Sequence, residues 1–347
     1  MPRSLTPDAL TADLDRHLAR VTRRRARRGL PAPQVRIEAP GFLYRSGEQT
    51  PFFSASIAKT ATATLIAQEV ERGSIAFDTP IAEILGSETD GLFRSPGATI
   101  EHLLSHTSGA ACYYEDDTLH GPRMKKLITE EPERWWEAAD LLQFVRERQR
   151  PIGEPGERFR YSDTGFVLLG RALEVITGRG AYQLMRERII EPAGMTNAVM
   201  WLREPGPARI APVLLGRRDF SATNALTIDW MGGGFASTTD DLAAFARALT
   251  DGTLLSADAW EHLATPRNRF RAGIHYGLGV MQLRFDGFSP LLRGLPRPVG
   301  HLGSTSAHMF ADRATGSSVV LNFHSSSEMR ASFMTHIRIA QQLARLG

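Results

Sequence analysis

The sequence contains little cysteine, little lysine and no long apolar run. Its one cysteine, Cys112, cannot form a disulfide within the chain, and we expect it to be a structural thiol. Only three of the 41 cationic residues are lysines, namely Lys59, Lys125 and Lys126. No stretch approaches the length of a membrane span, and the first residues lack the apolar core of a secretion signal. We therefore expect a cytoplasmic protein without a membrane span.

The remaining composition is that of a globular protein. At 347 residues, 42% hydrophobic and 23% charged, the chain is long enough for a substantial core and two lobes. The first 30 residues carry eight arginines and three aspartates, whereas the whole chain has a net charge of +3. We interpret this segment as a helix with a solvated basic face, with contact to nucleic acid or acidic lipid as the alternative. No DNA-reading motif accompanies the arginines, so we expect no nucleic-acid partner.

The periodicity of apolar residues predicts strands near both ends of the chain. Residues 8–29 indicate a helix, and the extended segments 35–38 and 42–45 flank Pro40-Gly41, which is a hairpin signal. A helix is expected next, from about residue 54 to 72. Near the other end we expect strands at residues 276–285, 298–304, 307–311 and 317–323, followed by a helix at 328–346.

Between these ends the pattern is mostly helical, from about residue 80 to 268. Helices are expected at residues 139–147, 164–177, 182–190 and 239–249. The sequence therefore predicts an α+β fold with an antiparallel sheet built from both chain ends and flanked by helices. We assign residues 1–82 and 269–347 to this sheet lobe, and residues 83–268 to an inserted helical lobe.

The position of Lys59 is the first indication of chemistry. It lies three residues after Ser56 in an apolar helix, so both side chains occupy one face in the first two turns. An arginine does not release its proton, whereas a desolvated lysine does. The pair therefore suits a serine nucleophile beside an amine. The alternative is that Ser56 caps the helix and Lys59 extends to solvent.

Four further motifs follow in order. They are Leu103-Leu104-Ser105-His106-Thr107-Ser108-Gly109, the segment 155–163 that ends in Tyr161-Ser162-Asp163, Gly232-Gly233-Gly234-Phe235-Ala236-Ser237-Thr238, and Gly300-His301-Leu302-Gly303-Ser304-Thr305. Together with Ser56-x-x-Lys59 they resemble the serine beta-lactamase and penicillin-binding-protein superfamily. The resemblance is to the branch of class C beta-lactamases, D-alanyl-D-alanine carboxypeptidases and related esterases, and it covers roughly residues 35–345. It implies a beta-lactamase-like two-lobe fold.

The resemblance also implies catalytic roles. Ser56 is expected to be the acylated nucleophile, Lys59 its neighbouring amine, and Tyr161 the phenol that completes the proton relay. The main-chain N–H groups of Ser56 and Ser304 are expected to form the oxyanion hole. For Tyr161 the alternative is a core aromatic residue whose hydroxyl is satisfied elsewhere.

Substrate contacts are expected from several further residues. His301 and Gly303 stand where the family often has Lys-Thr-Gly, on the strand that borders the site, although a solvent-facing strand residue is the alternative for His301. Tyr113, Tyr114 and Trp230 are expected to line the acyl pocket, with loop packing as the alternative. His102 and His106 have the spacing of a metal-binding pair but no third ligand, so we expect neither a metal nor a cofactor.

The chain departs from the family at Asp163, where an asparagine is usual. An ionised carboxylate accepts hydrogen bonds but does not donate them. Beside Lys59 it favours the ammonium form, so we expect the lysine to lower the pKa of Tyr161 and make the phenolate the base. Asp163 is also suited to hold a free amine, as in a D-aminopeptidase. His301 is mostly neutral at pH 7 and attracts a substrate carboxylate less than lysine does.

These observations favour a serine hydrolase that works through an acyl-enzyme on a small-molecule ester, amide or lactam. An uncharged ester best fits a site with Asp163 in place of asparagine and His301 in place of lysine, so an esterase is the expected activity. Acyltransferase, D-amino-acid peptidase or carboxypeptidase, and beta-lactamase activities are alternatives within the same chemistry. A covalent sensor that stays acylated, like some penicillin-binding proteins, is the alternative of another class. The sequence leaves the oligomeric state open.

Overall fold

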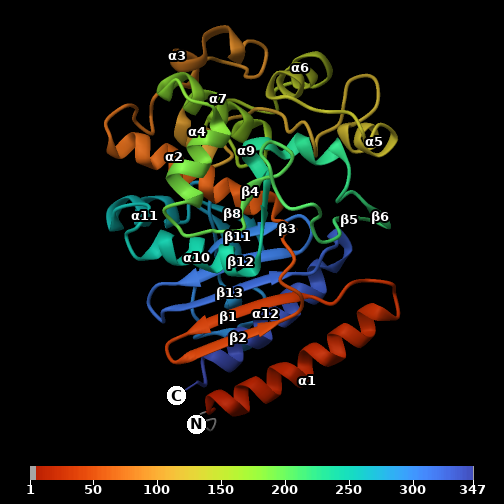
Figure 1. The fold of residues 1–347 in the computed structure, drawn as a ribbon. Coiled ribbons are helices and arrows are strands. Elements are labelled where there is room, and N and C mark those ends of the chain that lie inside the picture. The colour runs from red at the N-terminus through yellow and green to blue at the C-terminus, as the bar shows by residue number, and fades with distance from the viewer. Residues whose placement is uncertain (1–4, 347) are drawn as a thin grey trace.

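The computed structural model describes residues 5–346 and confirms the α+β class (Figure 1). The strands of the main sheet are β1 (Gln34–Ala39), β2 (Phe42–Ser46), β8 (Asn268–Arg271), β9 (Ile274–Tyr276), β10 (Met281–Leu283), β11 (Val299–Gly303), β12 (Ala307–Asp312) and β13 (Ser317–Asn322). They form one eight-stranded sheet in the order β2-β1-β13-β12-β11-β10-β9-β8. Every neighbouring pair is antiparallel, and β1 pairs with β13 from the other end of the chain.

Helices from both chain ends cover one face of this sheet. Helix α1 (Pro7–Ala26) begins at Thr6, whose hydroxyl accepts a hydrogen bond from the N–H of Ala9 at 3.3 Å. Its leucines at positions 10, 14 and 18 share one face and pack in a cluster with residues of β1, β2 and β13. Helix α12 (Met329–Leu343) contributes Ile339 to the same cluster.

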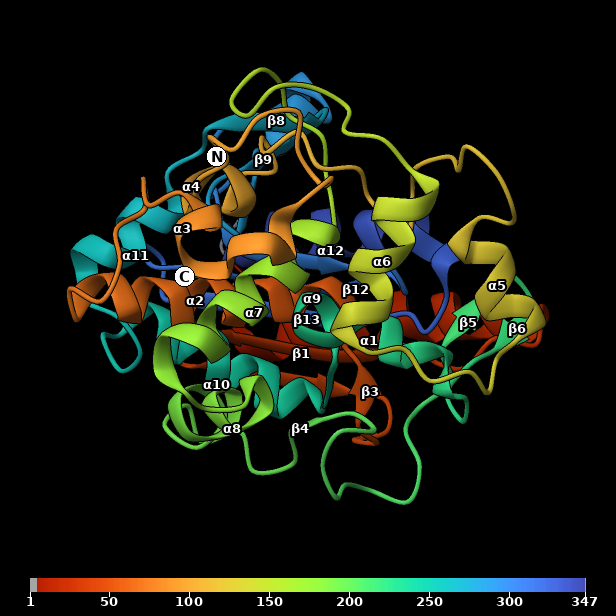
Figure 2. The same ribbon diagram turned by 90° about the horizontal axis from the view of Figure 1, so that it is seen from above.

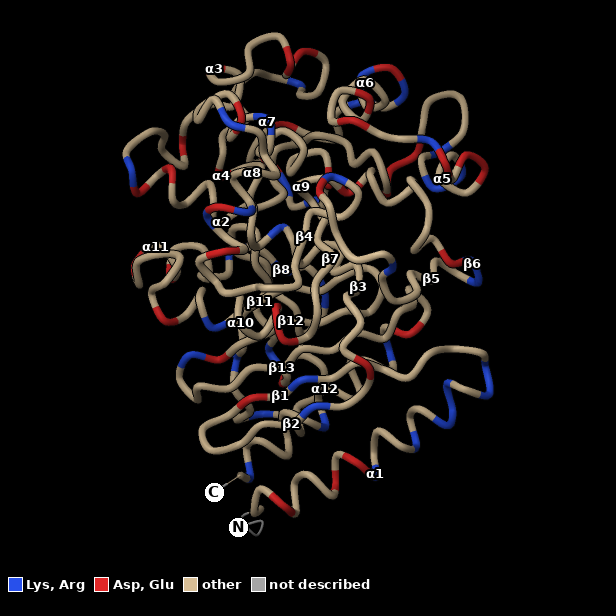
Figure 3. Tube along the Cα trace, in the orientation of Figure 1, with Lys and Arg blue, Asp and Glu red and all other residues tan. Residues whose placement is uncertain are grey.

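The basic end of α1 is not solvated along its whole length. Arginines are concentrated in its last turn, which Figure 3 shows as a blue stretch. Arg25 is only 2% exposed, and its guanidinium donates to Glu328 at 2.6 Å and to the carbonyl oxygen of Phe323 at 2.7 Å. Glu328 precedes α12, so this buried ion pair joins the two ends of the chain.

The middle of the chain supplies most of the remaining elements. The helices are α2 (Ala58–Glu71), α3 (Ile81–Leu85), α4 (Ile100–Leu104), α5 (Met124–Glu130), α6 (Ala138–Arg148), α7 (Thr164–Thr177), α8 (Ala181–Met185), α9 (Trp230–Gly233), α10 (Thr239–Thr250) and α11 (Ala257–Ala264). The small sheets are β3 (Phe52–Phe53), β7 (Phe235–Ser237) and β4 (Val199–Met200), and the pair β5 (Leu214–Leu215) and β6 (Arg218–Asp219). Short 3₁₀ turns are Ala55–Ile57, Gly86–Thr89, Asn224–Asp229, Phe285–Gly287, Pro290–Leu292 and Ser326–Glu328, and Arg186–Ile190 is a π-helical turn.

Helix α2 lies at the centre of the molecule. Its residues from Ala58 to Glu69 are all buried, which is the pattern of a helix surrounded by other elements. It contacts β11 on the side of the sheet and α7 and α9 on the other, as Figures 1 and 2 show. Alanine and threonine fill half of its length, so neighbouring elements approach closely. Lys59 is placed in this packed environment.

Two short strands joined by a turn lie where the sequence predicts one long strand. The segment 276–285 was predicted as a single strand, but β9 and β10 are separated by a turn in which the N–H of Gly277 donates to the carbonyl oxygen of Val280 at 2.9 Å. Gly279 has a φ of +70°, and an added Cβ would lie 2.4 Å from the Cβ of Ala63 in α2. The apolar pattern continued through this buried turn, so periodicity alone did not separate the two strands.

The division into a sheet lobe and a helical lobe remains a proposal. Helix α10 belongs to the middle segment of the sequence, yet it packs on β1, β12 and β13 of the main sheet. Strand β8, which the sequence analysis missed, begins at Asn268 and forms the outer edge of that sheet. In the described part of the chain, no helix combines the length and apolarity needed to cross a bilayer.

Candidate active site

Ser56 lies at a sharp turn between β3 and α2. The preceding residue, Ala55, has a φ of +50°, a conformation that is costly for a residue with a side chain. The N–H of Ser54 donates to the carbonyl oxygen of Phe235 at 2.8 Å, which ties the turn to β7. On the other side, a Cβ at Gly303 would lie 2.4 Å from the carbonyl oxygen of Ser54. A glycine at this position therefore allows β11 to approach the turn that presents Ser56.

Lys59 has three acceptors for its three N–H groups. Its Nζ lies 3.2 Å from Ser56 Oγ, 2.8 Å from the carbonyl oxygen of Gly232 and 2.6 Å from Asp163 Oδ1. The side chain is 1% exposed, and burial alone would lower its pKa. The carboxylates of Asp163 and Asp229 outweigh burial, so the pKa of Lys59 is raised above its usual value. Lys59 is therefore an ammonium ion in the resting protein.

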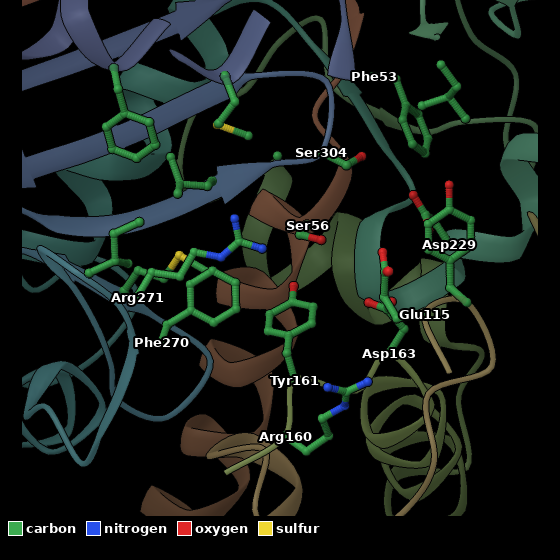
Figure 4. Close-up of a pocket in the computed structure, with 18 of the residues that line it drawn as sticks. Phe53, Ser56, Glu115, Arg160, Tyr161, Asp163, Asp229, Phe270, Arg271 and Ser304 are labelled. Carbon is green, nitrogen blue, oxygen red and sulfur yellow. The ribbon is translucent and has the colours of Figure 1, made fainter. Parts of the chain in front are cut away.

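The hydroxyl of Tyr161 points toward Ser56 at the cavity (Figure 4). Lys59 Nζ lies 5.2 Å from the centre of the Tyr161 ring. Burial, followed by the charge of Asp163, raises the pKa of Tyr161 well above its usual value. The expected lowering of this pKa by Lys59 is thus wrong, because burial disfavours the phenolate and the negative charge of Asp163 adds to that effect. The resting side chain is a neutral phenol.

The segment around His106 supports Tyr161 from behind. Its ring stacks on the Tyr161 ring at a centroid distance of 4.2 Å, and its Nδ1 accepts a hydrogen bond from the N–H of Ser162 at 3.1 Å. Its carbonyl oxygen also accepts from the N–H of Arg160 at 2.8 Å. His102 instead accepts from the N–H of Thr99 at 3.2 Å and caps α4. Within residues 5–346, no group of three or more His, Cys, Asp or Glu residues is placed to hold a metal.

A cavity of about 970 Å³ opens beside these residues. Of the residues predicted from the sequence, it is lined by Ser56, Tyr114, Tyr161, Asp163, Gly303 and Ser304. Figure 4 shows two different sides around Ser56 and Tyr161, with Asp163, Glu115 and Asp229 on one side and Phe270 and Arg271 on the other. The nucleophile therefore lies between an acidic wall and a wall with an arginine and aromatic rings.

The two expected oxyanion donors are both at the cavity. Among the backbone hydrogen bonds that the described residues make outside helices and strands, none uses the main-chain N–H of Ser56 or of Ser304. Strand β10 pairs only with Val299 and Gly300 of β11, so the edge of β11 beyond them is not covered by a neighbouring strand. Two free N–H groups beside a serine hydroxyl are the arrangement that binds a tetrahedral oxyanion.

Three residues expected to contact substrate do not reach the cavity. His301 is fully buried, its Nδ1 donates to the carbonyl oxygen of Leu302 at 2.7 Å and its Nε2 lies 3.1 Å from Tyr276 Oη. Burial, followed by the charge of Lys59, lowers the pKa of His301 to about 3. Tyr113 is buried and donates to the carbonyl oxygen of Ile228 at 2.7 Å, and Trp230 is buried in the core cluster.

In each case the adjacent residue lines the cavity instead. Leu302 and Asp229 line it next to His301 and Trp230, and Tyr114, which was itself expected there, lines it next to Tyr113. For β11 the reason is the alternation of side chains along a strand, which sends neighbours to opposite faces. The sequence motifs therefore located the correct segments, but they did not give the direction of each side chain.

Asp229 is a cavity residue that the sequence analysis missed. It lines the cavity beside Asp163, and its carboxylate has no hydrogen bond or ion pair within the described residues. Burial, with the nearby charge of Asp163, raises its pKa to about 7 against the opposing effect of Lys59. The signal available in the sequence was an acidic residue in an apolar run, directly before Trp230-Met231 and the glycine that accepts from Lys59.

Asp163 itself is not free to bind a ligand cation. One oxygen pairs with Lys59, and the other accepts from the thiol of Cys112 at 3.4 Å. Cys112 is fully buried, and burial followed by the charge of Asp163 raises its thiol pKa well above the usual value. The thiol therefore serves as a weak donor to the carboxylate.

Comparison with known proteins adds the following findings. The family model described as Beta-lactamase matches residues 41–344. Penicillin-binding protein 4 of Amycolatopsis lactamdurans is 31% identical over 169 residues, which are 48% of this chain and 40% of that protein. The Beta-lactamase of Escherichia coli strain K12 is 25% identical over 203 residues, which are 58% of this chain and 48% of that protein. The chain thus matches about half or less of the length of these relatives.

Solved structures resemble the chain over nearly its whole length. A D-stereospecific amidohydrolase from Streptomyces sp. has a TM-score of 0.79 at 26% identity, covering 91% of this chain and 94% of that one. The D-amino acid amidase from Ochrobactrum anthropi SV3, complexed with D-phenylalanine, has a TM-score of 0.79 at 22% identity and coverages of 96% and 99%. EstCE1, a hydrolase with promiscuous acyltransferase activity, has a TM-score of 0.73 at 19% identity and coverages of 96% and 99%. The last two likenesses concern the fold alone.

Proposed function

The chain belongs to the Beta-lactamase family, and from this premise we propose that it is a serine hydrolase that forms an acyl-enzyme at Ser56. We further propose that its acyl donors are amides or esters of amino acids with a free amino group. The observation that carries the second proposal is Asp229, an unpaired carboxylate in the cavity wall close to the nucleophile. An ammonium group on the acyl part of a substrate would satisfy this carboxylate.

In this mechanism Tyr161 relays a proton from Ser56 to the leaving group and stays a neutral phenol. Ser56 attacks the substrate carbonyl and transfers its proton to the phenol oxygen, while the phenol gives its own proton to the leaving group. Tyr161 gains one proton and loses one, so no phenolate has to form. This agrees with the raised pKa of Tyr161. In deacylation, water transfers a proton to Tyr161 and the phenolic proton returns to Ser56.

Lys59 acts as a fixed positive charge in this scheme. Its ammonium group donates to Ser56 Oγ at 3.2 Å and stabilises negative charge that develops there during attack. Asp163 keeps the lysine protonated and holds it in place at 2.6 Å. The main-chain N–H groups of Ser56 and Ser304 are the proposed donors to the oxyanion.

Amide cleavage on D-amino acids is the variant that we favour. The support for it is the likeness to the D-stereospecific amidohydrolase from Streptomyces sp. at 26% identity. Ester hydrolysis of uncharged acyl groups is the second candidate. It is favoured by the apolar residues of the cavity wall, which include Phe53, Ile228, Phe270, Ile274, Leu302 and Phe333.

A substrate panel separates these candidates. Purified wild type and Ser56→Ala are given D- and L-phenylalanine p-nitroanilide, p-nitrophenyl butyrate and nitrocefin, and intact-protein mass spectrometry follows the acyl adduct. We expect the D-amino-acid anilide to give the highest kcat/KM and Ser56→Ala to be inactive on all four. A faster butyrate ester would select the second candidate. Activity retained in Ser56→Ala, or no adduct on wild type with any substrate, would refute the proposed nucleophile.

A further inference from the structure

The cavity wall across Ser56 from Asp229 carries positive charge without partners. Arg271 of β8 lies on this wall, next to Arg269 of the same strand, and Arg330 in the first turn of α12 also lines the cavity. All three are exposed, and none makes an ion pair or side-chain hydrogen bond within residues 5–346. Figure 4 shows the guanidinium of Arg271 reaching across the wall toward Ser56. The cavity therefore has arginines without partners on one side of Ser56 and the unpaired carboxylate of Asp229 on the other.

The shape of β8 explains why adjacent residues face the same cavity. It is the edge strand of the main sheet, and its register with β9 shifts between Arg269 and Arg271. Such an irregularity interrupts the alternation of side chains, so Arg269, Phe270 and Arg271 all line the cavity. The guanidinium of Arg271 lies 5.2 Å from the centre of the Phe270 ring, a cation–π distance that favours an orientation over the ring.

The volume of the cavity leaves room on this side. Pockets for drug-sized ligands range from about 300 to 1,000 Å³. At about 970 Å³ the cavity is near the upper end of that range, which exceeds the need of a single amino-acid amide. The space beyond the acyl group is bordered by Phe270, Phe288 and Phe333 together with the arginines. A leaving group larger than ammonia is therefore accommodated.

We propose that this arginine wall binds a carboxylate on the leaving group, so that the substrates are short peptides with a free amine at one end and a free carboxylate at the other. The inference rests on the proposed function, because it assigns the leaving group of the same reaction. Arg271 is the specificity-determining residue, since its guanidinium is directed toward the reacting centre and has no other anion to bind. His301 does not compete for this role, because it is buried and neutral.

The test compares two peptides that differ only in terminal charge. D-Phenylalanyl-D-alanine and its C-terminal amide are hydrolysed by wild type, Arg271→Gln and Arg271→Lys, and kcat/KM is measured for each. We expect wild type to prefer the free carboxylate by about tenfold, the size typical of one partly exposed charged hydrogen bond. Arg271→Gln is expected to bring the ratio close to one, and Arg271→Lys to restore part of it. The difference should appear in KM, because the contact is made equally in the ground state and the transition state.

Controls distinguish this inference from the proposed function. Arg313→Gln removes an exposed arginine from the turn between β12 and β13, outside the cavity, and should leave the ratio at the wild-type value. A wild type that prefers the amidated peptide, or equal ratios in Arg271→Gln and wild type, overturns the arginine wall as a carboxylate site. D-Phenylalanine p-nitroanilide has a neutral leaving group, so its turnover and its Ser56 adduct test the proposed function independently.

Discussion

The reaction centre and the arginine wall differ in how their charges are satisfied. Lys59 and Asp163 are nearly buried, lie 2.6 Å apart, and each has further hydrogen-bond partners. Arg269 and Arg271 are exposed and have no partner within the described residues. Burial requires that a charge be paired, whereas an exposed charge remains hydrated and available. The comparison indicates that the centre is fixed for chemistry and the wall is left open for recognition.

Replacement of Asp163 by asparagine should have the largest effect on the centre. Removing one partner of a buried ion pair leaves the other charge uncompensated and typically costs about 3–5 kcal/mol. We expect the free energy of unfolding, measured by urea denaturation at pH 7, to fall by about 3 kcal/mol. Asp117→Asn is the control, because the Asp117–Arg123 pair is 74% and 60% exposed. Equal losses in both variants would show that the buried pair does not stabilise the fold.

Lys59→Arg should preserve the charge and still lower acylation by about a hundredfold or more, or about 2.7 kcal/mol. The space is confined: a Cβ on Gly232 would lie 3.3 Å from Lys59 Nζ. A planar guanidinium cannot meet Ser56, Gly232 and Asp163 in the geometry of an ammonium. Acylation is followed by mass spectrometry, with Lys126→Arg as the control for an exposed lysine. Near-normal acylation in Lys59→Arg would mean that charge alone is sufficient.

The buried histidines of the centre should make the fold sensitive to acid. Burial lowers the pKa of His301 to about 3, while in the unfolded chain it is near 6.5. As the pH falls below 6.5 the unfolded state takes up a proton that the folded state does not, so stability decreases. We expect a loss of about 2 kcal/mol per such histidine between pH 6.5 and 5. His301→Gln should reduce this pH dependence, whereas exposed His120→Gln should not. A flat stability profile in wild type would contradict the buried neutral state.

More residues of the reaction centre than of the cavity walls could be predicted from the sequence. Ser56 and Lys59 are one helical turn apart, so their proximity follows from helix geometry and needed no tertiary information. The predictions for α7 and for the strands β11 to β13 are also confirmed, because their apolar periodicity is strong and the turns between them are clear. Tyr161 required the family resemblance, since 101 residues of chain lie between it and Lys59.

The walls depend on features that a sequence does not display. The side of β11 that faces the cavity was not predictable, so His301 was chosen where Leu302 lines the wall. The bulge in β8 breaks the alternation on which strand prediction relies, and Arg271 was missed with it. The pKa of Tyr161 was predicted in the wrong direction, because Asp163 is visible in the sequence but the burial that dominates the shift is not.

The smallest expected effect concerns Asp229, the one carboxylate of the acidic wall that we assign to recognition. Its pKa of about 7 means that it is protonated below pH 7 and ionised above. The preference for D-phenylalanine p-nitroanilide over its des-amino analogue should therefore rise as the pH increases through 7. It should fall again near pH 8, where an α-amino group loses its proton. Asp229→Asn should reduce the preference by about tenfold, or about 1.4 kcal/mol, and remove the rise in preference on the low-pH side of the profile, the low-pH limb.

Glu115→Gln is the comparison, because Glu115 already pairs with Lys125 at 2.6 Å. A low-pH limb that persists in Asp229→Asn would assign it to another group and leave the acidic wall, like the arginine wall, open to a different ligand.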